Sequence, residues 1–215
     1  MVEKLWVVEP ESQPTGSDGR VLTERGVRTR ERLLQAAEEV FAALGYHDAS
    51  IVKITEAAKV GQGTFYLYFE SKKQIFDELV MYLNRRVRHA MSERSALATT
   101  RAERERLGFE GYFRFTAEHP TIYRIIRQAA IVSPDMLREH YRRIAHGYVR
   151  GLQDAMDGGE IDPADPEVLA WILMGIGEMV GMRWVLWGES HSVPSDVFDQ
   201  MYQFITRGLG TGDQG

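Results

Sequence analysis

Hydroxyl, amide, aromatic and basic side chains are concentrated between residues 50 and 73 of this chain, in the run SIVKITEAAKVGQGTFYLYFESKK. Amide and hydroxyl groups can exchange hydrogen bonds with the edges of DNA bases, and Gln62 and Thr64 carry such groups. Tyrosine hydroxyls and lysine can instead reach phosphate oxygens. The candidates for phosphate contact are Tyr66, Tyr68 and Lys72. The run therefore has the chemistry of a nucleic-acid contact.

These groups need short helices joined by a tight turn to hold them at a fixed angle, and the same run predicts such helices. Ser50 can cap a helix that ends near residue 58, Gly61 breaks the chain, and a second helix covers 62–69. Ser71-Lys-Lys-Gln74 is a capping box that opens a third helix. A small core can join the segments: Phe41, Ile54, Ala57, Val60, Phe65 and Phe69. The pattern predicts a helix-turn-helix whose second helix enters a major groove.

Helical patterning continues along the rest of the chain, and no alternating strand pattern occurs in it. A leading helix is expected at 30–44, and the helix after Ser71 runs to about residue 96. Later helices are predicted at 107–118, 121–132, 134–156, 165–187 and 195–207. The fold class is therefore all-α, with about nine helices: an N-terminal helix-turn-helix head of three helices and a C-terminal helical body.

Composition excludes several classes of function. The chain has no cysteine, so it has no disulfide framework, thiolate metal site or cysteine nucleophile. The six histidines are scattered, and neither a nucleophile elbow nor a phosphate-binding or dinucleotide-binding loop is present. We therefore expect neither an enzyme nor a bound metal or cofactor. The net charge is −5, but residues 20–75 hold nine Lys/Arg against seven Asp/Glu, which permits DNA binding without arguing for it.

One apolar stretch, residues 168–188, is long enough to cross a membrane. It contains Glu178 and Arg183, whose charges are costly in hydrocarbon, so we interpret it as a buried helix. The N-terminal apolar run, 5–8, is too short for a signal peptide. A cytoplasmic protein without a membrane partner is expected.

The run from Val60 to Phe69, followed by Ser71 and Lys72, resembles the signature of TetR/AcrR-type bacterial transcriptional regulators. The resemblance covers about residues 28–80, and it implies a ligand-responsive regulator, usually a repressor. Such a protein would bind a palindromic double-stranded operator as a homodimer at the nucleoid and release it when a small molecule enters the body. By position, the resemblance makes the following residues DNA contacts: Ser50, Gln62, Gly63, Thr64, Tyr66, Tyr68 and Lys72.

The sequence departs from the family pattern at two positions of this motif. Gly61 stands where a capping Ser or Thr is usual, which puts one phosphate contact in doubt. Leu67 stands where a polar residue is common, which suggests a base preference of its own.

Three parts of the chain are expected: a mobile tail at 1–26, a DNA-binding domain at 27–73, and a ligand-binding and dimerisation domain at 74–215. The arginines of the tail can touch phosphates or remain solvated.

The helix at 165–187 is apolar on two faces, so both faces need cover. One face can pack on its own subunit, and the other can form a four-helix seam with a partner. We assign the following residues to the dimer interface: Leu173, Ile176, Val180, Trp184, Val197, Met201 and Ile205.

An effector pocket is expected among the aromatic and methionine side chains of the body. Its predicted lining is Phe109, Tyr112, Phe113, Tyr123, Arg127, Tyr141, Trp171, Met174, Glu178 and Met182. Arg127 and Glu178 can equally form a plain ion pair. Arginines on the same helices can bind an anionic head group, which favours a fatty acid or acyl-CoA; a neutral aromatic or drug-like compound is the alternative. A second class of function is a helical protein-interaction module that does not bind DNA.

Overall fold

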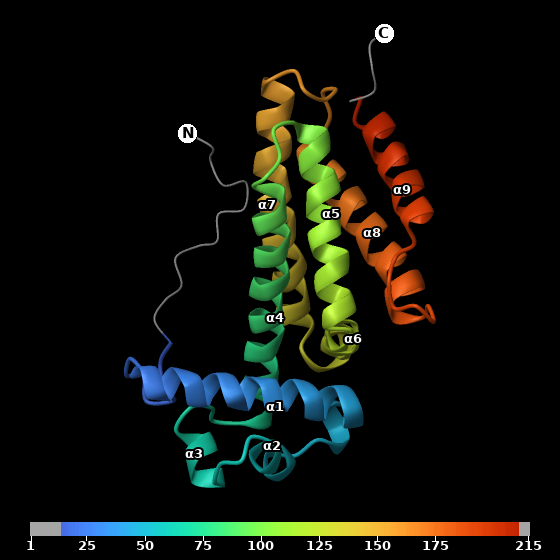
Figure 1. Ribbon diagram of the computed structural model, residues 1–215. Coiled ribbons are helices and arrows are strands. Elements are labelled where there is room, and N and C mark those ends of the chain that lie inside the picture. Colours follow the sequence, from blue (N-terminus) through green and yellow to red (C-terminus); the bar gives the residue numbers. More distant parts are fainter. Residues whose placement is uncertain (1–13, 211–215) are drawn as a thin grey trace. The chain divides into compact units, whose positions relative to one another are not determined.

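The computed structural model describes residues 14–210, and within them the chain is helical with no β-strand, which confirms the predicted fold class (Figure 1). The chain forms two compact units. We call residues 14–83 and 121–140 the head unit, and residues 84–120 and 141–210 the body unit. Helices α4, Lys72–Ser95, and α7, Pro134–Asp157, each pass from one unit into the other along their length.

The helix-turn-helix lies in the head unit, and local sequence signals set its boundaries. Helix α1 is Glu24–Asp48, with Thr23 as its N-cap and a break at Gly45, whose φ of 77° is a conformation that favours glycine. Ser50 caps α2, Ile51–Ala57, by accepting from the Lys53 amide at 3.2 Å. Helix α3, Gln62–Tyr66, is shorter than the predicted 62–69.

Aromatic side chains form the core of the head unit. Phe41 from α1, Phe65 and Phe69 around α3, and Phe76 from α4 are all fully buried. The rings of Phe41 and Phe76 meet edge to face with centroids 5.2 Å apart, an arrangement favoured by their quadrupoles. The contact of Phe41 with Phe76 joins α1 to α4, and the Arg30 guanidinium of α1 lies 5.3 Å from the centre of the Phe69 ring, just after α3.

Helix α6, Thr121–Val132, packs on α1 in the same unit. Its Gln128 amide donates to the Phe41 carbonyl at 3.1 Å, and its Arg124 guanidinium donates to the Ala42 carbonyl at 3.4 Å. Both carbonyls lie in the last regular turn before the break at Gly45, where helix carbonyls need other partners. The head unit therefore includes a helix that the predicted boundary at residue 73 assigns to the body.

The body unit contains α5, Arg101–Glu118, α8, Pro166–Gly181, and α9, Ser195–Gly208, and α5 contacts both of the others (Figure 1). Asp165 caps α8 by accepting from the Glu167 amide at 2.8 Å. Gly177 allows close packing of α8 on α5, because a Cβ there would lie 2.9 Å from the Phe109 ring. After α8 the chain continues as a π-helical segment, Met182–Leu186.

Part of the predicted tail, 1–26, lies outside the described residues. Its described part begins with a turn closed by a bridge between Thr15 and Val21. The helix that was expected from residue 30 already begins at Glu24.

Candidate nucleic-acid interface and effector site

Helix α3 presents one polar face to solvent and one aromatic face to the core. Phe65 is fully buried, whereas Gln62, Gly63 and Tyr66 are exposed. Thr64 and Tyr68, also expected to contact DNA, are half-buried. Leu67 is 63% exposed at the end of the helix, so an apolar side chain lies on the surface that would meet DNA.

The turn between α2 and α3 is tight. Lys59 has a φ of 53°, a left-handed conformation that is costly for a residue with a side chain. The next helix begins after Gly61, which provides no side-chain cap. Ser50, another predicted DNA contact, uses its hydroxyl to cap α2, and its side chain is half-buried. Within residues 14–210 the backbone amides of Gln62 and Gly63 at the start of α3 have no backbone acceptor, so they can face an approaching phosphate.

Lys72 has a structural task that the sequence does not reveal. Its ammonium donates to the carbonyls of Tyr46 and Ala49, both at 2.8 Å, and to that of His47 at 3.3 Å. It also lies 4.5 Å from the centre of the Tyr46 ring. An ammonium has three N–H donors, so all of them have acceptors in the chain. Lys72 therefore fastens the start of α4 to the carbonyls after the break in α1.

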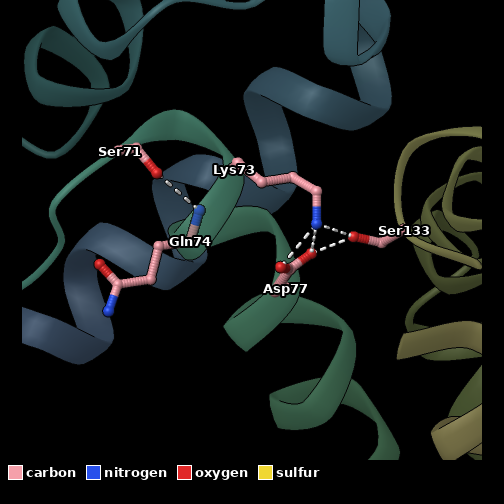
Figure 2. Close-up of polar contacts among 5 residues, drawn as sticks. All are labelled: Ser71, Lys73, Gln74, Asp77 and Ser133. Atoms are coloured by element: carbon pink, nitrogen blue, oxygen red, sulfur yellow. Dashed lines mark hydrogen bonds and ion pairs between the residues drawn. The ribbon is translucent and has the colours of Figure 1, made fainter. Parts of the chain in front are cut away.

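A second polar cluster joins the start of α4 to the start of α7 within the head unit. The Lys73 ammonium contacts both Asp77 carboxylate oxygens, at 2.8 and 2.7 Å, and the Ser133 hydroxyl (Figure 2). Ser133 is buried and also donates to Asp77. In the same picture Ser71 caps α4 by accepting from the Gln74 amide at 3.1 Å. The sequence indicated this cap, but it gave no sign that Lys73 and Asp77 would meet Ser133, 56 residues after Asp77.

The predicted effector residues divide between the two units. Tyr123 is buried and Arg127 is exposed, and both belong to the head unit. The other eight belong to the body unit: Phe109, Tyr112, Phe113, Tyr141, Trp171, Met174, Glu178 and Met182. Among these, Phe109 and Phe113 are stacked with ring centres 6.0 Å apart, and both are buried. Aromatic side chains of α5 therefore form the interior of the body unit.

Glu178 has a partner in the body unit. The Tyr141 hydroxyl lies 2.9 Å from both of its carboxylate oxygens, and Trp171 lies beside the Tyr141 ring. Burial, together with the charge of Glu178 and the hydrogen bond to it, holds the pKa of Tyr141 well above its usual value. Tyr141 therefore remains a neutral hydrogen-bond donor to the carboxylate.

The predicted dimer residues do not share one environment. Leu173, Met201 and Ile205 are buried inside their own chain. The remaining four are half-buried: Ile176, Val180, Trp184 and Val197. The exposed apolar side chains of α8 and α9 are Val168, Trp171, Ile172, Met179 and Phe204.

Helix α8 with its π-helical extension is long and apolar enough to cross a membrane. Only 28% of its most apolar stretch is buried within the single chain. It is packed on α5 at Gly177 and carries Glu178, which is bonded to Tyr141. A large apolar surface of α8 thus remains uncovered.

Comparison with known proteins gives the family of the N-terminal part. Residues 33–79 match the family of bacterial regulatory proteins, tetR family. YdgC of Bacillus subtilis strain 168, an HTH-type transcriptional regulator, is 45% identical over 67 residues. That match covers 31% of this chain and 34% of YdgC, so the chain spans about a third of that relative.

Other matches extend into the body unit. The fatty acid metabolism regulator protein of Bacillus subtilis strain 168 is 27% identical over 161 residues, which cover 72% of this chain and 82% of that protein. The structure of the transcriptional regulator FadR from Bacillus subtilis in complex with stearoyl-CoA is similar with a TM-score of 0.73. It is 21% identical, and the similarity covers 85% of this chain and 99% of FadR. The helical fold is therefore shared over nearly the whole described chain.

Proposed function

We propose that the chain is a TetR-type, ligand-responsive transcriptional regulator, which represses by binding a palindromic operator as a homodimer and is released by a long-chain acyl-CoA. The observation that carries the operator proposal is the outward face of α3, where Gln62, Gly63 and Tyr66 are exposed above the buried Phe65. The protein acts in the cytoplasm as a regulator rather than an enzyme.

Base reading is assigned to the start of α3. Replacing Gln62 or Thr64 by alanine should weaken operator binding by roughly 1–3 kcal/mol for each side chain that contacts a base edge. The measurement is a gel shift on a duplex that the wild-type protein selects from a randomised library, with a scrambled duplex as the non-specific probe.

Glu56→Ala, which removes an exposed side chain from α2, is the control for general effects on the head. If Gln62→Ala and Thr64→Ala both bind the selected duplex as tightly as wild type, α3 is not the helix that reads the bases. That result would then favour a helical module that binds protein rather than DNA.

The homodimer is proposed on the exposed apolar residues of α8 and α9. Val168, Ile172 and Met179 follow the spacing of one helix face, and Phe204 on α9 is 70% exposed. A second copy that presents the same surface would bury these side chains in an isologous seam. The seam would cover the side of α8 that its own chain leaves exposed. The dimer would then place its two heads on two half-sites about one DNA turn, or a multiple of it, apart.

An acyl-CoA effector is proposed from the interior of the body unit and from the related proteins. The stacked phenylalanines of α5, Met174 of α8 and Met182 of the π-helical segment are apolar side chains of the same unit that can accept a lipid chain. A related protein is a fatty acid metabolism regulator, and FadR has been solved with stearoyl-CoA. Tyr141 and Glu178 provide the polar groups of the same unit.

The response to an effector needs an element that differs between two states. Helices α4 and α7 pass from the body unit into the head unit. In the head unit Ser133, just before α7, is bonded to Asp77 of α4, and Gln128 of α6 is bonded to α1. A displacement of α6 or of the start of α7 therefore reaches both α1 and α4, and it can change the spacing of the two heads.

Stearoyl-CoA is expected to raise the melting temperature and to weaken operator binding. A ligand at about one hundred times its Kd stabilises the folded state by about 2.7 kcal/mol, which is roughly 5–10 °C for a chain of this size. Differential scanning fluorimetry and a gel shift would use stearoyl-CoA, free stearate, CoA and the neutral aromatic biphenyl. A response to biphenyl alone would replace the acyl-CoA by a neutral aromatic effector.

A further inference from the structure

The turn at residues 14–22, which we call the strap, closes on itself before α1 begins. The Gly16 amide donates to the Arg20 carbonyl at 2.9 Å, and the Leu22 amide donates to the Pro14 carbonyl at 2.9 Å. Gly19 provides the positive φ that the turn requires, at 77°. Thr23 then caps α1 directly. The strap is therefore a small ordered unit joined without a linker to the first helix.

The strap is bonded to the C-terminal end of α3. The Ser17 hydroxyl donates to the Tyr66 carbonyl at 2.8 Å, and the Ser17 amide donates to the Leu67 carbonyl at 3.0 Å. Gly16 lies so close that a Cβ on it would be 2.9 Å from the same Leu67 carbonyl. The last carbonyls of a helix have no hydrogen-bond donor within the helix. Ser17 of the strap, 49 residues before Tyr66, provides donors for them.

Helix α3 needs such support because it is short. It has five residues, and so few hydrogen bonds scarcely offset the cost of helix nucleation. Its N-cap, Gly61, makes no side-chain hydrogen bond, and Phe65 is its buried residue. A helix held at one buried position can tilt about it unless an end is fixed. The two bonds from Ser17 fix the C-terminal end.

We propose that the strap sets the angle of α3 in the DNA groove and that Ser17 is a positioning residue for sequence recognition. Ser17 acts through the Tyr66 and Leu67 carbonyls and need not touch DNA itself. Base contacts depend on the angle of the reading helix, whereas phosphate contacts tolerate small changes in it. Loss of the strap should therefore lower discrimination between sequences more than it lowers binding to DNA in general. The inference rests on the proposed role of α3.

Ser17→Ala should weaken binding to the selected duplex by about 2- to 10-fold, the usual worth of one hydrogen bond. Gly16→Ala should weaken it by about 10-fold or more, because its methyl group would push the strap off both carbonyls. Binding to the scrambled duplex, and its dependence on salt, should stay as in wild type. Ser17→Thr keeps the hydroxyl and should restore the selected-duplex affinity.

Two controls separate the strap from other causes. Thr15→Ala removes an exposed hydroxyl that makes no hydrogen bond within residues 14–210, and it should change nothing. Arg20→Ala removes a charge that is 88% exposed, and any effect of it should appear equally on both duplexes. Equal losses on both duplexes for Ser17→Ala, or no loss, would overturn the proposal.

Amide hydrogen exchange tests the strap without DNA. The Ser17 amide should exchange more slowly than the neighbouring Asp18 amide, which has no acceptor within residues 14–210. Equal exchange rates at Ser17 and Asp18 would refute the strap even if α3 reads the operator. A wild-type protein with a protected Ser17 amide but no preferred sequence would refute the operator proposal, and the positioning role with it.

Discussion

Replacing Ile172 and Phe204 together by aspartate is expected to give a monomer that no longer binds the operator. The two side chains are 50% and 70% exposed in the single chain, so the change should leave its fold intact. In the proposed seam they would place four carboxylates in an apolar interface, where each is costly without a partner. One head alone loses the effective concentration that the second provides, which is about 10²- to 10⁴-fold in affinity.

Sedimentation velocity and a gel shift on the selected duplex would measure the two effects. The matched control is Leu97→Asp with Ile131→Asp, which adds the same charge at apolar positions that are 67% and 81% exposed but lie outside α8 and α9. The control should remain a dimer with wild-type operator affinity. A seam variant that stays dimeric, or a monomeric wild type, would remove this interface.

Which face of α8 is free could not be predicted from the sequence. The helix is apolar around most of its circumference, so its periodicity favours no side. The structure buries Leu173 against the rest of its own chain and leaves Ile172, one residue away, exposed. An aspartate at Ile205, which is 3% exposed, would unfold the body rather than separate two subunits. Packing of α5 on α8 contributes to this choice, and that contact comes from a distant part of the chain.

Signals that act within one turn were predictable. Ser50 and Ser71 cap their helices as expected, because a cap depends on residues only a few positions away. Tasks set by distant partners were not predictable. A lysine after a helix-turn-helix is typical of a phosphate contact, yet Lys72 reaches backbone carbonyls 23 to 26 residues earlier. The strap has the polar, glycine-rich composition of a tail, and its partners are carbonyls of α3.

Arg101→Met is expected to cost about 3–5 kcal/mol of unfolding free energy, a large part of the stability of a typical domain. Arg101 and Glu105 form an ion pair one turn apart on α5, and their side chains are only 3% and 2% exposed. The Arg101 amide is also bonded to Glu160 at 2.7 Å. Removing the guanidinium leaves the Glu105 carboxylate in the interior without its counter-charge. The loss should therefore exceed that of the double variant Arg101→Met/Glu105→Leu, which removes both charges.

The loss should depend on pH in a direction fixed by Glu105. Burial raises the pKa of Glu105 in the folded chain, and the charge of Arg101 opposes this rise. In Arg101→Met the opposing charge is gone, so the folded pKa should rise further above the unfolded value of about 4.3. The folded state then binds more protons than the unfolded state across that interval. The contribution of Glu105 to the stability of the variant is therefore most favourable below about pH 4.3 and is lost as the pH rises through the folded pKa.

Urea unfolding at about pH 7 and about pH 5 would measure the loss of unfolding free energy and the direction in which it changes with pH. A carboxyl whose pKa in the folded chain is raised above about 4.3 takes up a proton on folding within this pH range. Arg101→Met should recover part of its lost stability at the lower pH relative to wild type, and the double variant should not. Arg138→Met is the matched control, because Arg138 pairs with Asp135 at the surface, where the side chains are 72% and 82% exposed. A surface pair contributes at most about 1 kcal/mol. An Arg101→Met protein that loses no more than the Arg138→Met protein would show that this buried pair is not what holds the start of α5.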